Sequence, residues 1–186
     1  DAANITNSGD SGSNGTVGGT TGGTATIVNG VGPGGFVTNY LALTPTDESF
    51  EGIAAPHINT GGTIGSLAIA GDQTYTFAAY VRFDSQTGDN MVFGSNAGDV
   101  LHLGARGADY WSGHWGDDVN SAGAPSTENG VWHHVAWTND GANGAQEIFV
   151  DGVSVATGGA GATGAYTANS AEALLVGTSR NGGSFL

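Results

Sequence analysis

The chain has 186 residues, of which 17 are acidic, three are Arg and none is Lys, so that its formal net charge is −14. This balance excludes nucleic acid as a partner, because phosphate binding needs clustered Lys and Arg, and an anionic membrane surface would repel the chain equally. Cys is absent, which excludes disulfides, thiolate metal sites and Cys nucleophiles, and no apolar run of about 18 residues is present to enter a membrane.

The first 35 residues differ in composition from the rest of the chain. They are rich in Gly, Thr and Asn, and only Ala25–Val28 forms a short apolar run. The composition is typical of a flexible linker, whereas the apolar run favours an ordered edge strand over Thr24–Asn29, and both alternatives stay open. We therefore separate an N-terminal segment, residues 1–35, from a domain over residues 36–186.

Short alternating segments dominate the rest of the chain. Gln73–Phe83 alternates throughout, with apolar side chains at odd positions for a core and with Tyr80 and Arg82 on the more open face. Further strands are predicted over Phe36–Leu43, Ser66–Ala70, Met91–Gly94, Asp99–Arg106, Tyr110–Gly116, Val131–Thr138, Gln146–Val150, Val153–Thr157 and Leu174–Thr178. Asp151-Gly152 is a strong signal for a two-residue hairpin turn.

No segment has helical periodicity, and the 35 Gly disfavour helices while favouring tight turns. About ten short strands without intervening helices predict an all-β fold. We expect an antiparallel two-sheet β-sandwich, or jelly roll, with little or no helix.

Polar and aromatic side chains gather between residues 100 and 118. We expect the strands on either side of Gly107-Ala108-Asp109 to form a hairpin that places His102, Arg106, Tyr110 and His114 on one face. Such a set can hydrogen-bond a neutral or anionic sugar while an aromatic ring stacks on it. A purely structural network of the same side chains is the alternative.

Two more residues and a metal site complete the candidates. Tyr80 and Arg82, on the open face of their strand, join the candidate ligand-binding set. Without Cys, a metal site would most simply use oxygen ligands, which makes calcium the candidate ion. Asp117 and Asp118, beside the predicted sheet, are the best pair of ligands, although no calcium-loop motif is present.

Four runs resemble the laminin-G-like branch of the concanavalin-A-like lectin/glucanase jelly rolls. They are GVWHHVAWTNDG, EIFVDGVSVATG, TYTFAAYVRF and LLVGTSRNGG, and the match covers about residues 36–186. The resemblance implies two antiparallel sheets, one of them concave, often a bound calcium ion, and commonly a binding role on extracellular proteins. It also implies that Trp132 packs in the fold and that one of His133 and His134 is buried.

Both ends of the chain differ from this family. The family usually continues past the last Gly turn into one more strand, and it usually opens with an apolar strand before any Gly-rich stretch. We therefore expect a fragment or processed subunit. A second hypothesis is that a neighbouring chain supplies the missing strand at the exposed sheet edge beside the C-terminal strand.

Catalysis is not the expected activity. Retaining glucanases need two carboxylates about 5–5.5 Å apart, and the nearest acidic group, Asp47-Glu48-Ser49-Phe50-Glu51, lies in a predicted loop. Lyases on related jelly rolls use Gln, His, Arg and Tyr, and the hairpin set supplies most of these types without the lyase motifs. We expect a non-catalytic module, extracellular or on the cell surface, that binds a glycan or another surface component. A structural subunit of a surface layer, fibre or large adhesin and a polysaccharide-active enzyme are the alternatives.

Overall fold

The structure is a computed structural model. It describes residues 4–5, 15–18, 23–45, 56–63, 74–84, 89–95, 101–113, 118–122, 125, 127, 130–140, 145–158 and 172–178. The strands of this part are β1 (Asn4–Ile5), β2 (Gly15–Gly18), β3 (Gly23–Val31), β4 (Val37–Pro45), β5 (His57–Thr63), β6 (Tyr75–Val81), β7 (Asp89–Ser95), β8 (His102–Arg106), β9 (Asp109–Gly113), β10 (Val119–Asn120), β11 (His133–Asp140), β12 (Ala145–Val150), β13 (Val153–Gly158) and β14 (Ala173–Val176). The described helical structure is a single 3₁₀ turn, η1 (Pro33–Gly35), and no described helix has the length and hydropathy to cross a membrane.

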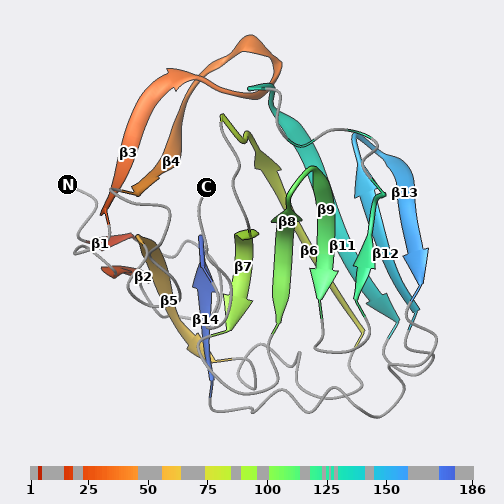
Figure 1. Cartoon of the computed structure of the whole chain (residues 1–186). Helices are drawn as coiled ribbons and strands as arrows, with labels where there is room; N and C mark the ends of the chain where they lie inside the picture. The colour runs from red at the N-terminus through yellow and green to blue at the C-terminus, as the bar shows by residue number, and fades with distance from the viewer. Residues whose placement is uncertain are drawn as a thin grey trace.

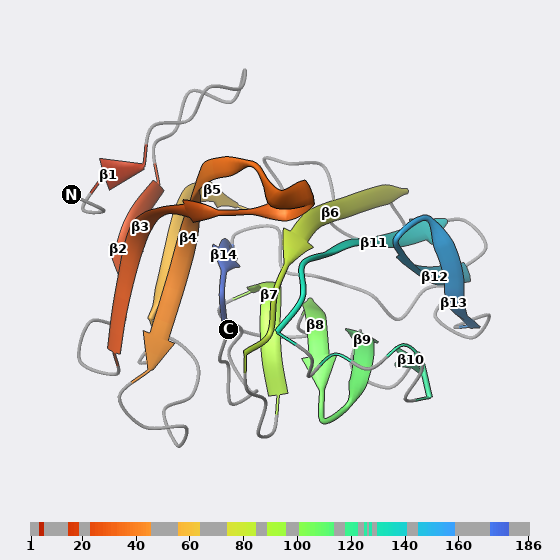
Figure 2. The same cartoon turned by 90° about the horizontal axis from the view of Figure 1, so that it is seen from above.

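The strands form two large sheets and a hairpin. The eight-stranded sheet has the order β1-β2-β5-β14-β7-β8-β9-β10, the four-stranded sheet has the order β13-β12-β11-β6, and β3 pairs with β4 alone. Figure 1 looks onto the eight-stranded sheet with the four-stranded sheet behind it, and Figure 2 shows the two layers from above. The predicted all-β antiparallel sandwich is confirmed.

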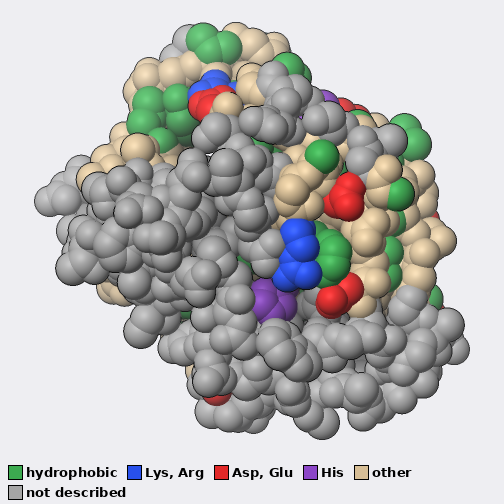
Figure 3. Space-filling model, viewed as in Figure 1, with side chains coloured by type: hydrophobic (Ala, Val, Ile, Leu, Met, Phe, Trp, Pro, Cys, Tyr) green, Lys and Arg blue, Asp and Glu red, His purple; other side chains and the backbone are tan. Residues whose placement is uncertain are grey.

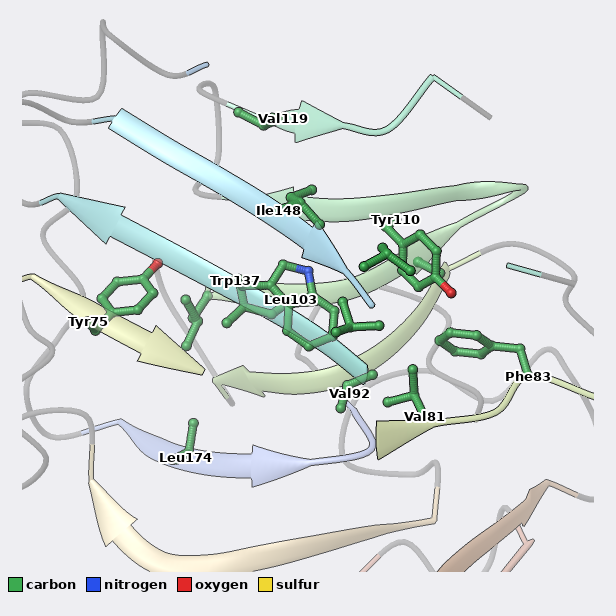
Figure 4. Close-up of a cluster of buried hydrophobic side chains, with 14 residues drawn as sticks. Tyr75, Val81, Phe83, Val92, Leu103, Tyr110, Val119, Trp137, Ile148 and Leu174 are labelled. Carbon is green, nitrogen blue, oxygen red and sulfur yellow. The ribbon is translucent and has the colours of Figure 1, made fainter. Parts of the chain in front are cut away.

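A core of buried side chains fills the space between the two large sheets. Its members are Tyr75, Val81, Phe83, Val92, Leu101, Leu103, Ala105, Tyr110, Val119, Val135, Trp137, Ile148, Val150 and Leu174. Trp137 of β11 and Leu103 of β8 lie together near the centre, and Tyr110 and Phe83 lie at one end (Figure 4). The odd positions of β6 face this core as the sequence predicted, because Tyr75 is buried while Tyr80 is exposed.

A bulge in β7 shapes the middle of the eight-stranded sheet. Met91 pairs with Gly104 and Phe93 pairs with Leu103, so Val92 is an extra residue between two pairs. Both Val92 and Phe93 consequently pack into the inter-sheet core. A Cβ on Gly104 would overlap the β7 backbone, so the close approach of the strands at the bulge requires glycine here.

The turn between β12 and β13 is the predicted two-residue turn. Asp151 and Gly152 have φ of 52° and 80°, as a type I′ turn requires. The Asp151 carboxylate also accepts hydrogen bonds from His133 Nδ1 at 2.7 Å and from the His134 backbone N–H at 2.9 Å. The hydrogen bond from His133 is the main reason that the pKa of Asp151 is lowered. Asp151 therefore fixes both the turn and its position against β11.

The N-terminal residues that the structure describes belong to the same fold. β2 pairs with β5 inside the eight-stranded sheet, and the β3–β4 hairpin runs continuously across residue 35. The hairpin packs through Ala25 and Leu43 against Ile58 of β5, a strand that sequence patterns did not predict. The described residues thus show an ordered strand over Thr24–Asn29, and the division of the chain at residue 35 stays a prediction.

The C-terminal strand of the described part has no free edge. β14 pairs with β5 on one side and with β7 on the other. The hypothesis that a neighbouring chain adds a strand beside β14 is therefore wrong, because this chain already fills both positions. The predicted strand Ser66–Ala70 lies outside the described residues.

Replacing Trp137 should test the central position of this side chain. Trp137 is fully buried, and Trp137→Ala is expected to lower the free energy of unfolding by about 3–5 kcal/mol, since it removes a large contact area and leaves a cavity. Urea unfolding followed by circular dichroism measures the change. Val153→Ala, at a side chain that is 63% exposed, is the control and should change stability by less than about 0.5 kcal/mol. Equal effects of the two substitutions would contradict the assignment of Trp137 to the core.

Candidate functional site

The hairpin of β8 and β9 turns over two residues rather than the expected three. Arg106 pairs with Asp109, so the turn consists of Gly107-Ala108, and Gly107 has φ of 55°. Residues that pair across antiparallel strands share a face, and a shift of one residue exchanges the two faces of a strand. Trp111, and not Tyr110, therefore lies on the same face as Arg106.

Tyr110 belongs to the inter-sheet core. It pairs with Ala105, is fully buried, and has its ring centroid 6.3 Å from that of Phe83. Among the residues that the structure describes, its hydroxyl has no hydrogen-bond partner. Burial, with a smaller effect of the Asp151 charge, raises the pKa of Tyr110 to about 12. The expectation that Tyr110 shares an outer face with Arg106 is wrong, because the shorter turn directs its side chain inward.

The outer face of the eight-stranded sheet carries an Arg stacked on a Trp. The Arg106 guanidinium carbon lies 4.1 Å from the ring centroid of Trp111, a cation–π contact. Asp109 pairs with Arg106, and Asn120 of β10 pairs with Trp111. We call these four residues the Arg106 patch. Figure 3 shows a basic side chain over β8 and β9 with hydrophobic and acidic side chains beside it.

Exposed and half-buried side chains of β8, β9 and β10 form one part of this outer face. Arg106 and Asn120 are exposed, and Trp111 is half-buried. His102 points to the same face as Arg106 because it alternates with the core residue Leu103, yet only 5% of it is exposed. His102 therefore does not present its ring to a ligand at this surface.

Tyr80 and Arg82 lie on the outer face of the other sheet. The Tyr80 ring is exposed, with its centroid 5.1 Å from that of His134. Arg82 Nη2 donates to the Asp84 carboxylate at 2.6 Å, and this hydrogen bond raises the pKa of Arg82. Since the core separates the two sheets, the six predicted ligand-binding residues do not form one site. His114 lies outside the described residues.

Trp132 joins the four-stranded sheet to the β3–β4 hairpin. Its ring centroid is 5.3 Å from that of Tyr40, and its Nε1–H donates to the Val31 carbonyl at 3.3 Å. The Arg82 guanidinium carbon lies 5.6 Å from the same ring. Trp132 thus packs against the hairpin, outside the inter-sheet core.

Comparison with known proteins places this architecture in a family. The family model described as the concanavalin A-like lectin/glucanases superfamily matches residues 56–186. The chain belongs to this superfamily. A similar solved structure is domain 4 of AbnA, a GH43 extracellular arabinanase from Geobacillus stearothermophilus, in complex with arabinotriose. It has 18% identity and a TM-score of 0.60, with 89% of this chain and 73% of that chain covered. The comparison with curated proteins finds no match.

A calcium site in this concanavalin A-like chain stays a prediction. Asp117 lies outside the described residues, and Asp118 is exposed just before β10. Among the residues that the structure describes, no three His, Asp or Glu side chains lie close enough to hold a metal ion.

Tyr110→Phe should separate the buried hydroxyl from the rest of the core. At neutral pH the variant is expected to be as stable as the parent or more stable by about 1 kcal/mol, because an unpaired buried hydroxyl is removed. The pKa of Tyr110 is raised from 10.0 to about 12 in the folded state, so the unfolded chain loses its proton first and the parent loses stability between these pH values.

The loss in the parent should reach about 3 kcal/mol at most, and Tyr110→Phe should lose less stability over the same interval. Urea unfolding at several pH values, followed by Trp fluorescence, measures this difference. Tyr80→Phe, at an exposed ring, is the matched control and should change stability at neutral pH by less than about 0.5 kcal/mol. The same pH dependence in Tyr110→Phe and in the parent would contradict the raised pKa.

Proposed function

We propose that the protein is a non-catalytic carbohydrate-binding module, extracellular or on the cell surface, that holds a neutral glycan at the Arg106 patch. The observation that carries the proposal is the Arg106 guanidinium over the Trp111 ring on an open sheet face. Membership in a superfamily of lectins and glucanases supports it, as does the likeness to a domain solved with arabinotriose. That domain belongs to an extracellular arabinanase, which supports the proposed location.

The patch has the donors and acceptors that sugar hydroxyls need. Arg106 offers several N–H donors, and Asp109 offers carboxylate acceptors from the neighbouring strand. The Asn120 side-chain oxygen accepts the Ala122 backbone N–H at 3.1 Å, which leaves its amide hydrogens to donate outward. Each sugar hydroxyl both donates and accepts hydrogen bonds, so neighbouring hydroxyls can bind to donors and acceptors that lie side by side.

Charge favours a neutral ligand over an anionic one. Arg106 is the one basic side chain of the patch, and Asp109 opposes its charge. The whole chain has a formal net charge of −14 and therefore repels polyanions. Binding of a neutral glycan should accordingly depend little on salt, because no counter-ions need to be displaced.

Carboxylates near Arg106 bear on whether this surface binds or hydrolyses a glycan. Glycoside hydrolysis takes two carboxyl groups on either side of the bond, about 5–9.5 Å apart. Asp109 and Asp89 pair with Arg106 from the two neighbouring strands, so the proposed non-catalytic role is tested by assaying the purified chain for polysaccharide hydrolysis. The acidic run Asp47–Glu51 lies outside the described residues.

Substitutions in the patch should weaken glycan binding without unfolding the chain. Arg106→Ala and Trp111→Ala are each expected to lower affinity for a neutral polysaccharide about tenfold or more, since each removes half of the stacked pair. Affinity electrophoresis with arabinan, xylan, galactan and mixed-linkage β-glucan, beside the anionic polymers alginate and polygalacturonate, measures the effect. Val153→Ala serves as the surface control. Equal binding by Arg106→Ala and the parent, or retardation by the anionic polymers alone, would refute the proposal.

A further inference from the structure

The outer face of the four-stranded sheet has an ordered pattern of its own. Across β6 and β11, Tyr80 pairs with His134, Ala78 pairs with Ala136, and Thr76 pairs with Thr138. All six side chains alternate with core residues of these strands and therefore point away from the core. The face thus carries an aromatic row, a row of small methyl groups and a row of hydroxyl groups.

On β12 and β13 the rows continue with other residue types. Phe149 pairs with Ala136 on one side and with Ser154 on the other, and Glu147 pairs with Thr138. The Ser154 hydroxyl donates to the Glu147 carboxylate. The two alanines therefore form a shallow floor between the rings of Tyr80 and Phe149, with hydroxyl and carboxylate groups along one side.

We call Tyr80, His134, Ala78, Ala136, Phe149, Thr138 and Glu147 the Tyr80 platform. Its Tyr80 residue is 59% exposed, beside the small side chains of Ala78 and Ala136. Beyond the Tyr80 row, Arg82 and Trp132 close the platform where the β3–β4 hairpin is attached. The platform is therefore open along the strands and bounded at one end.

We propose that the Tyr80 platform is a second carbohydrate-binding surface, which takes consecutive units of a neutral polysaccharide chain. A flat methyl floor beside an exposed ring fits the apolar face of a sugar, and the Thr138 and Glu147 oxygens can accept hydrogen bonds from its hydroxyls. From Thr76 to Tyr80 the strand extends about 13 Å, which is longer than one sugar ring. The platform therefore suits a chain better than a monosaccharide.

Charge and composition select this ligand over others. The platform has the carboxylate of Glu147 and no Lys or Arg, in a chain of formal net charge −14, so an anionic polymer is repelled. Protein interfaces are usually centred on large apolar and aromatic side chains, whereas the centre of this platform is Ala78 and Ala136. A neutral, hydroxyl-rich chain matches both features.

The platform and the Arg106 patch lie on opposite outer faces, so one molecule can contact two polymer segments at once. Binding to a long polysaccharide then gains from avidity, while binding to a short oligosaccharide does not. This inference shares the carbohydrate ligand of the proposed function but uses none of the Arg106 patch residues. Each surface can therefore be tested without the other.

The experiment compares four variants of the full chain with the parent. Tyr80→Ala removes the exposed ring, and Ala78→Arg fills the floor at an exposed position where folding should be unaffected. Arg106→Ala removes the other surface, and Val153→Ala is the control on the same sheet. Retardation is measured in gels that contain arabinan, xylan, galactan or mixed-linkage β-glucan, and unfolding in urea confirms that each variant is folded.

We expect Tyr80→Ala and Ala78→Arg each to lower retardation by the polymer about tenfold, and we expect Arg106→Ala to retain part of the parent's binding. Unchanged retardation in both platform variants would overturn the inference and leave the proposed function standing. Loss of all binding in Arg106→Ala alone would also overturn it. Full binding in Arg106→Ala with loss in Tyr80→Ala would support the platform and refute the proposed function. A parent that binds none of the four polymers would refute both.

Discussion

The packing of two sheets around one shared core determines what every strand can offer to solvent. Trp137, Ile148 and Leu103 occupy the space between the sheets, and the buried hydrogen bond from the Ser112 hydroxyl to the Gln146 side-chain oxygen, 2.6 Å long, joins the sheets within it. Side chains alternate along a strand, so when one residue points into the core, its two neighbours point to the outer face. The residues that pack in the core therefore determine which residues lie on the two outer faces. A side chain on an outer face would point into the core only if the pairing of its strand shifted by one residue.

Much of the framework follows from sequence patterns alone, because alternation is strong where a strand has one buried face. The pattern of Gln73–Phe83 and the Asp151-Gly152 turn were sufficient to predict β6 and the β12–β13 hairpin. β5 was not predicted, because His57–Thr63 contains two glycines and little apolar alternation. Its pairing depends on neighbours far away in sequence, β2 and β14, and such partners leave no local signal.

The candidate site shows how a single turn limits prediction from sequence. Counting Asp109 as a turn residue placed Tyr110 beside Arg106, whereas the two-residue turn places Trp111 there and buries Tyr110. A Gly at the first position of a two-residue hairpin loop is a recognised signal, and Gly107 occupies that position with a positive φ. Of the four residues of the Arg106 patch, the sequence analysis had named Arg106 alone, and the face on which its neighbours lie depended on one residue of loop length. The separation of Tyr80 and Arg82 from Arg106 had no local signal, because it follows from which strands join which sheet.

The two described arginines have related environments on opposite faces of the sandwich. Arg106 lies over Trp111 and Arg82 lies over Trp132, in a chain with 17 acidic residues and only three Arg. An acidic residue accompanies each, by cross-strand pairing for Asp109 and by a hydrogen bond for Asp84. Each guanidinium therefore contributes a planar, oriented set of donors with little excess positive charge. Such groups fit the proposed recognition of uncharged hydroxyl groups, which depends on the direction of hydrogen bonds more than on charge.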